Sequence, residues 1–170
     1  REITEDTLDK SLSAVSNFVF PILNENNELK GTYSVLGLNN CIKQIQKKQK
    51  QLISAINKNL FNNTIDKDDI DTFIAYDEKN KSISGNLFKI KYIKIFSTKF
   101  YTLFENLHSL IENKKGSKTA FIYSNLVQVG IELVRNMMLV NGYLEYSNDK
   151  KYNISENTVD YLTGKTYKQC

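Results

Sequence analysis

Cysteine and histidine are scarce in this sequence of 170 residues, which limits metal and nucleophilic chemistry. Cys41 and Cys170 lie far apart and belong to no Cys-x-x-Cys pair, so neither a zinc site nor a disulfide framework is expected. The single histidine, His108, has no serine, cysteine or second histidine placed to work with it. We therefore expect reduced thiols, no metal site and no catalytic residue in this chain.

Long apolar runs are also absent. No run approaches the roughly 20 residues that a membrane-spanning helix needs, and the first ten residues, REITEDTLDK, lack the features of a signal peptide. We expect an intracellular protein without a membrane partner. The net charge of +4, from 23 basic and 19 acidic residues, is only weak evidence for a polyanionic partner. Because the chain begins with arginine and ends directly after a basic stretch, we expect it to be an internal fragment of a longer protein.

Four aspartates crowd one short segment. They are Asp66, Asp68, Asp69 and Asp71. A calcium loop would need glycine at its sixth position and glutamate at its twelfth, and both are missing. We interpret these aspartates as acids at the start of a helix, where the helix dipole favours negative charge.

Apolar spacing predicts three helices before residue 112. The first covers residues 3–19 and is stopped by Pro21, the only proline; the second covers residues 41–60, with lysines opposite its apolar face; the third follows Ser97 as its N-cap. The core-facing positions of the second are Ile42, Ile45, Gln49, Leu52, Ile53 and Ile56, and those of the third are Phe100, Leu103, Phe104, Leu107, Leu110 and Ile111.

Two connecting segments leave alternatives open. Residues 24–40 mix turn formers with a short apolar patch, which predicts a loop with at most a brief hairpin or the start of a helix. Residues 87–96 alternate apolar and basic side chains, which is compatible with either a strand or a connecting segment.

The segment Thr119–Tyr123, TAFIY, is short, rich in β-forming residues and almost wholly apolar. This pattern predicts a parallel strand buried on both faces. A helix is expected to follow from Val127 to Asn141, with Gly142 as its C-terminal cap, and a second apolar run covers Val159–Leu162. The alternation of helix and strand predicts a helix-rich α/β fold with a parallel sheet.

Polar residues follow both predicted strands. They are Ser124 and Asn125 after the first, and Gly164, Lys165 and Thr166 after the second. In a parallel sheet such strand ends lie at one edge, where hydroxyl, amide and backbone N–H groups can bind phosphate oxygens. On spacing alone, Ser124 and Asn125 also fit a polar strand end that caps the next helix.

The Gly-Lys-Thr triplet at residues 164–166 does not form a Walker A loop. That loop needs an earlier glycine at fixed spacing, and no glycine lies between Ser147 and Thr163. Without it the backbone cannot wrap a triphosphate.

The order of these motifs resembles the second RecA-like lobe of superfamily-two helicase-like ATPases of nucleocytoplasmic large DNA viruses. The pattern is similar to that of the Swi/Snf-like and poxvirus nucleoside-triphosphatase branches, including the early-transcription-factor type. The matching elements are Lys99 with Leu103, Tyr123-Ser124-Asn125, Gly142-Tyr143, and Leu162-Thr163-Gly164-Lys165-Thr166. Two departures stand out, since Asn125 replaces the usual glutamine and Lys165 occupies a serine-like place.

A second anchor of the resemblance is SNFVFP at residues 16–21, which is similar to a segment between the two lobes of such proteins. The resemblance implies an inter-lobe helix and SNFVFP segment in residues 1–23. It also implies a mostly helical, lineage-specific insertion in residues 24–95 and the N-terminal part of the second lobe in residues 96–170.

The resemblance implies that Ser124, Asn125, Gly164, Lys165 and Thr166 contact a nucleic-acid backbone without reading its sequence. The parent protein would use ATP and Mg²⁺, and would work with the viral transcription machinery in the host cytoplasm (viral factory) or the virion. The chain itself lacks the Walker A lysine, the D-E-x-H motif and the arginine finger that hydrolysis needs, so we expect it to be inactive alone.

The alternative is a non-enzymatic helical module. In that interpretation the basic helix over residues 41–60 binds RNA, DNA or a partner subunit.

Overall fold

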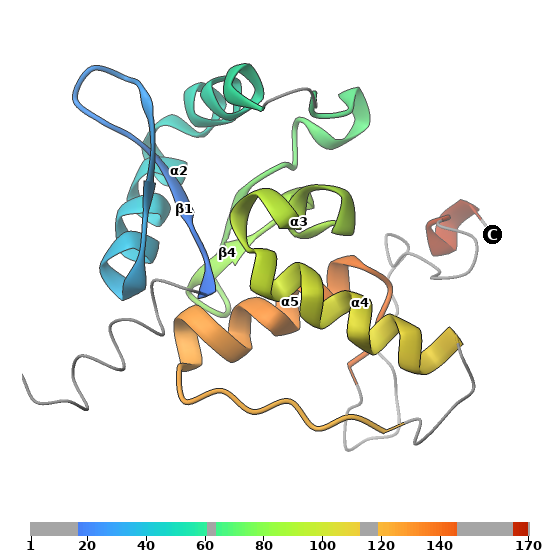
Figure 1. The fold of residues 1–170 in the computed structure, drawn as a ribbon. Helices are drawn as coiled ribbons and strands as arrows, with labels where there is room; N and C mark the ends of the chain where they lie inside the picture. The colour runs from blue at the N-terminus through green and yellow to red at the C-terminus, as the bar shows by residue number, and fades with distance from the viewer. Residues whose placement is uncertain (1–16, 61–63, 113–118, 146–164, 170) are drawn as a thin grey trace, which may run out of the picture.

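The computed structural model describes residues 17–60, 64–112, 119–145 and 165–169 (Figure 1). Most of the helix predicted over residues 3–19, the run Val159–Leu162 and Gly164 lie outside the described residues.

A hairpin packed on a long helix forms the first part of the fold. Strand β1 (Phe20–Leu23) pairs antiparallel with β2 (Leu29–Thr32), and helix α2 (Ser34–Asn59) follows. Gln44 of α2 holds the end of β1, because its Oε1 accepts the Leu23 N–H at 2.7 Å and its Nε2 donates to the Leu23 carbonyl at 2.8 Å. The brief hairpin and helix start left open for residues 24–40 are therefore both present.

Helix α2 confirms the amphipathic helix predicted over residues 41–60, although it begins earlier. It buries one stripe of side chains: Leu38, Cys41, Ile45, Leu52, Ile53 and Ile56. Burial raises the pKa of the Cys41 thiol to about 12, so this thiol stays protonated and unreactive. The helix is kinked at Lys48, whose φ of −149° and ψ of 42° are not helical.

A short, irregular region connects α2 to the remaining helices. It consists of the 3-10 turn η1 (Lys67–Asp69), the antiparallel strands β3 (Ala75–Asp77) and β4 (Ser82–Ser84), and the 3-10 turn η2 (Asn86–Phe88).

Asp69 ties this region to the helix that follows. The side chain is 4% exposed; its carboxylate accepts from Lys89 Nζ at 2.5 Å, from Lys91 Nζ at 2.6 Å and from the Tyr92 hydroxyl at 3.0 Å. Burial by itself raises the pKa of Asp69, but the hydrogen bonds from the two lysines outweigh it and lower the pKa. Asp69, which we interpreted from the sequence as an acid at the start of a helix, is thus a buried partner of two lysines.

Residues 87–96 form no strand. After η2 they continue as helix α3 (Ile90–Phe96), because Tyr92, Ile93 and Phe96 fall on one buried face while Lys91 and Lys94 face solvent. Helix α4 (Thr98–Glu112) then begins at the predicted cap, where Ser97 Oγ accepts the Phe100 N–H at 3.0 Å.

The helices that follow Tyr123 also agree closely with the prediction. A single π-helical turn, η3 (Val127–Ile131), leads into α5 (Glu132–Val140). Gly142 has φ 90°, and its N–H donates to Leu139 while the Tyr143 N–H donates to Met138. This is a Schellman ending, which confirms Gly142 as the cap.

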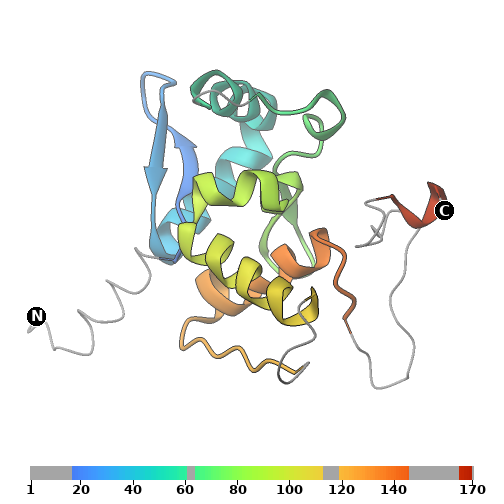
Figure 2. The same ribbon diagram turned by 45° about the vertical axis from the view of Figure 1, so that its right-hand side comes forward.

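The buried parallel strand predicted at Thr119–Tyr123 is not present. The segment is extended along α4 and α5, with Ile122 half-buried, while Phe121 and Tyr123 are 91% and 78% exposed (Figures 1 and 2). Both sheets in the described residues are two-stranded and antiparallel. The chain is therefore helix-rich with mixed α and β. Within the described residues no strand pairs with this segment, and a strand does not form alone.

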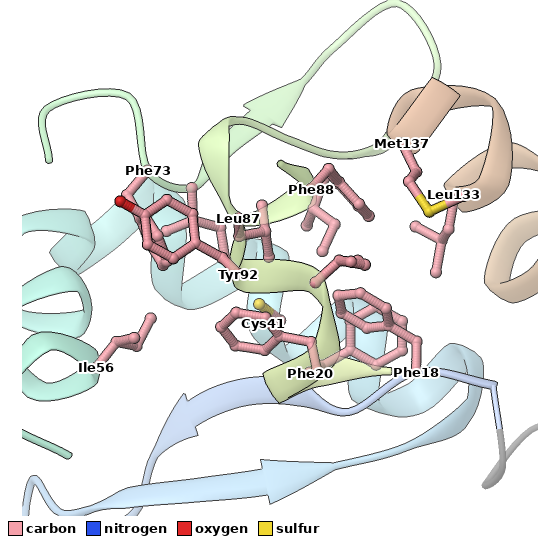
Figure 3. Close-up of a cluster of buried hydrophobic side chains, with 14 of the residues drawn as sticks. Phe18, Phe20, Cys41, Ile56, Phe73, Leu87, Phe88, Tyr92, Leu133 and Met137 are labelled. Atoms are coloured by element: carbon pink, nitrogen blue, oxygen red, sulfur yellow. The ribbon is translucent and has the colours of Figure 1, made fainter. Parts of the chain in front are cut away.

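Phe18 belongs to one continuous core of buried side chains (Figure 3). Its ring centroid is 4.9 Å from that of Phe20, 5.6 Å from Phe88, 5.9 Å from Phe96 and 6.0 Å from Phe100. These partners come from residues 1–23, 24–95 and 96–170, the three ranges that the resemblance implies. In this structure the three ranges share one core, and the division stays a prediction.

We expect Phe18→Ala to reduce the free energy of unfolding by about 3–5 kcal/mol, since it leaves a cavity among aromatic rings. Phe121→Ala is the matched control, because the same truncation at an exposed ring should change stability by no more than about 0.5 kcal/mol. Urea unfolding of the 170-residue chain measures both, and equal losses would contradict the central position of Phe18.

A candidate nucleic-acid backbone site at helix α4

A pocket of about 500 Å³ lies where the start of α4 meets Asn17 and the segment after Tyr123; we call it the α4 pocket. It is lined by Asn17, Thr98, Lys99, Phe100, Thr102, Leu103, Asn106, Ile122, Tyr123, Ser124, Gly130 and Val134. No carboxylate is among these residues, so the pocket favours an anion over a metal ion. The described residues likewise contain no group of His, Cys, Asp or Glu side chains that could hold a metal.

Asn17 organises the polar end of this pocket. Its Oδ1 accepts a hydrogen bond from Lys99 Nζ at 2.8 Å, and its Nδ2 donates to the Val129 carbonyl at 3.3 Å. Its carbonyl accepts from the Ser97 hydroxyl. Asn17 is buried, at 4% exposure, and it holds the ammonium group of Lys99, which is an exposed residue. Two of the three Lys99 N–H donors remain for a ligand.

Ser124 lines the pocket but is engaged in its own turn. Its Oγ accepts the Leu126 N–H at 3.2 Å and donates to the Leu126 carbonyl at 3.0 Å. The hydroxyl therefore holds the turn before η3, as a polar turn residue does. To donate to a ligand it would have to leave the Leu126 carbonyl, so Lys99 is the better donor in this structure.

The other predicted site residues are less closely grouped. Asn125 is exposed and does not line the α4 pocket. Lys165 is exposed and Thr166 half-buried, and the Thr166 N–H donates to Gln169 Oε1 at 3.0 Å in the short turn η4 (Tyr167–Gln169). Neither lines the pocket, and η4 lies apart from α4 in both views (Figures 1 and 2). Among the described residues, Lys165 and Thr166 thus lie away from Ser124; the second predicted strand itself lies outside the described residues.

Asn17 and Lys99 were not predicted as site residues, although the sequence held a signal for both. Each belongs to a motif of the resemblance, Asn17 to SNFVFP and Lys99 to the pair with Leu103. They are 82 residues apart, so the sequence alone could not predict their contact, which depends on how Phe18 is buried.

Comparison with known proteins points to a class of viral helicase-like proteins. No family model matches the chain, and no solved structure matches it. The chain is 35% identical over 167 residues to the Acanthamoeba polyphaga mimivirus protein named "Putative ATP-dependent RNA helicase L377". It is therefore a distant homologue of a giant-virus protein that bears a helicase name. The match covers 96% of this chain, so it includes most of residues 24–95, and 14% of the relative's length.

Gly130 keeps the wall of the pocket tight. A Cβ at this position would collide with Ser124 Oγ and lie 3.0 Å from Leu126 Cβ. The first helical turn after Ser124 therefore packs directly on the turn that Ser124 holds.

We expect Gly130→Ala to destabilise the chain by about 1–3 kcal/mol through this overlap, even though alanine usually favours a helix. In a Ser124→Gly background the collision with Oγ is gone, so the same substitution should be less destabilising by at least about 1 kcal/mol. A double-mutant cycle by urea unfolding measures this difference. Additive effects of the two substitutions would disprove the contact.

Proposed function

We propose that this chain is part of a viral superfamily-two helicase-like ATPase of the poxvirus nucleoside-triphosphatase type. In that protein the α4 pocket would contact the sugar-phosphate backbone of a nucleic-acid strand. One observation carries the proposal: Lys99, held by Asn17, shares a carboxylate-free pocket with Ser124. The homology to a mimivirus protein with a helicase name supports the class.

The chemistry of the α4 pocket suits phosphate. A fixed ammonium group offers charge-assisted hydrogen bonds, each worth about 1.5–3 kcal/mol, and hydroxyls from Thr98, Thr102 and Ser124 can add neutral ones. Contacts of this type position a strand without reading bases. Asn125 lies next to Ser124 and can reach the same strand, and Gly164, Lys165 and Thr166 are proposed as a second backbone contact.

ATP and Mg²⁺ would be used by the parent protein rather than by this chain alone. The sequence holds no Walker A loop, no D-E-x-H motif and no arginine finger, which together form the hydrolytic site of such enzymes. We propose that the parent couples ATP hydrolysis to movement on DNA or RNA, within viral transcription in the host cytoplasm or the virion. The described residues include no helix long and apolar enough to cross a membrane.

We also propose that Thr119–Tyr123 becomes a buried parallel strand in the parent. Its large exposed apolar rings, Phe121 and Tyr123, support this, because a strand between two neighbours would cover them. Phe121→Ala should then destabilise the parent by about 3–5 kcal/mol while leaving the isolated chain unchanged. Thermal unfolding of both proteins tests this, and an unchanged parent would refute the strand.

Hydrolysis assays of the parent test the nucleic-acid contact. Ser124→Ala with Asn125→Ala, and separately Lys99→Gln, should weaken the nucleic-acid stimulation of ATP hydrolysis by about fivefold or more. Basal hydrolysis should stay within about twofold, because these groups touch phosphates of the strand and not of ATP.

Lys79→Gln is the control for lost charge, since Lys79 is exposed in the turn between β3 and β4. It should leave stimulation unchanged. If Lys99→Gln and the double variant are stimulated as strongly as the unmodified protein, the α4 pocket has no such role.

A further inference from the structure

The positive charge of this chain is concentrated in one segment. Residues 29–65 contain six lysines and no acidic residue. The rest of the chain has 17 basic and 19 acidic residues, the remainder of the 23 and 19 in the whole sequence, and so carries a net charge of −2. All of the net positive charge therefore comes from the segment that contains β2 and α2.

The fold gathers half of these lysines around one hollow, which we call the α2 groove. Its volume is about 490 Å³, and it is lined by Ile22, Asn40, Lys43, Gln44, Lys47 and Lys48. Lys43 and Lys47 are exposed and Lys48 is half-buried. The ion pairs between described residues include those of Lys89, Lys91 and Arg135, and none involves a lysine of the groove.

The floor of the α2 groove is rigid. Gln44 is held by both of its hydrogen bonds to Leu23, so β1 cannot slide along the helix. One turn further, Gln49 Nε2 donates to the Ile74 carbonyl at 2.6 Å, which anchors α2 just after the kink at Lys48. The lysines therefore project from a backbone that is fixed on both sides of the kink.

Without a bound anion, the lysines of the groove repel one another. Lys43 and Lys47 are four residues apart, and like charges at this spacing destabilise a helix by about 0.2–0.5 kcal/mol. An anion in the groove would remove the repulsion. From Lys43 to Lys47, before the kink, the helix rises about 6 Å at 1.5 Å per residue, so these two lysines lie one turn apart and can contact different phosphates of one strand.

We propose that the α2 groove binds the sugar-phosphate backbone of a nucleic-acid strand, independently of base sequence and separately from the α4 pocket. The two sets of lining residues have no member in common. A separate hollow of about 690 Å³ lies against the later part of α2; its lining includes Lys50 and Lys58 but also the carboxylate of Glu28, so we do not include it in the site.

The lining favours nucleic acid over a protein partner. Five of its six side chains are lysines or amides, and only Ile22 is apolar. Protein interfaces are poor in lysine and are anchored by aromatic or other large apolar groups, whereas nucleic-acid interfaces are polar and strongly positive.

Salt-dependent binding of the whole 170-residue chain tests the proposal. The probes are fluorescein-labelled single strands of about 20 nucleotides with one mixed sequence, made as RNA and as DNA, titrated between about 50 and 300 mM salt. The triple variant Lys43→Gln, Lys47→Gln, Lys48→Gln should bind at least about tenfold more weakly near 0.1 M salt. Its slope of log affinity against log salt should fall by about 2, because three phosphate contacts each contribute about 0.7.

The matched control removes the same charge elsewhere. Lys30→Gln, Lys67→Gln, Lys79→Gln changes three exposed lysines outside the groove and should keep the slope within about 0.5. Circular dichroism of both triple variants should match that of the unmodified chain. Equal losses in the two would show that net charge alone attracts the strand, and the proposal would be overturned.

Two further results separate this proposal from the α4 pocket and from other partners. If Lys99→Gln lowers affinity but the groove variant does not, the α4 pocket stands and the groove is refuted; the reverse result refutes the α4 pocket alone. If the unmodified chain binds polyglutamate more tightly than either strand, the partner is an acidic protein surface and the proposal is wrong.

Discussion

The burial of Phe18 is the interaction on which the rest of the described fold depends. Its ring contacts β1, η2, α3 and α4, and so joins the hairpin to the helices that follow. The backbone is fixed with it, because the Val19 N–H donates to the Phe96 carbonyl at 2.9 Å and Ser97 donates to the Asn17 carbonyl. The same burial places Asn17 beside Lys99, so the core and the α4 pocket share one cause.

Side-chain amides, rather than charges, fasten most of the remaining elements to one another. Asn136 of α5 donates to the Ile83 carbonyl at 2.9 Å. Asn141 accepts the Ile90 N–H at 2.9 Å and donates to the Phe88 carbonyl at 2.8 Å. Gln44 likewise accepts the Leu23 N–H and donates to the Leu23 carbonyl. An amide can satisfy a buried N–H and a buried carbonyl together without the desolvation penalty of an ion, which suits junctions between short elements. The abundance of asparagine, which composition alone would attribute to coding bias, is therefore also used structurally.

The two polar hollows differ in how their cations are held. In the α4 pocket one ammonium group is fixed by a buried amide, whereas the lysines of the α2 groove are held only through their backbone. A fixed donor favours a ligand at one position, and flexible lysines along a rigid helix favour an extended polyanion that can shift along them.

Local patterns in the sequence determined the elements whose stability is local. Apolar spacing predicted α2, α4 and α5, Ser97 was recognised as a cap from its own position, and Gly142 from the φ that a helix ending requires. These features depend on residues a few positions apart, so periodicity and capping rules suffice.

Contacts between distant segments were decided only by the tertiary structure. Thr119–Tyr123 has the composition of a buried strand, but no other strand in the described part of the chain pairs with it, so it is extended with Phe121 and Tyr123 exposed. Residues 87–96 became helical because one face could be buried against Phe18 and Phe73. The pairing of Lys99 with Asn17 follows from packing across a long sequence separation, as does the position of Ile22 of β1 beside the lysines of the α2 groove. A periodic pattern identifies which face of a segment is apolar, but not which other segment will cover it.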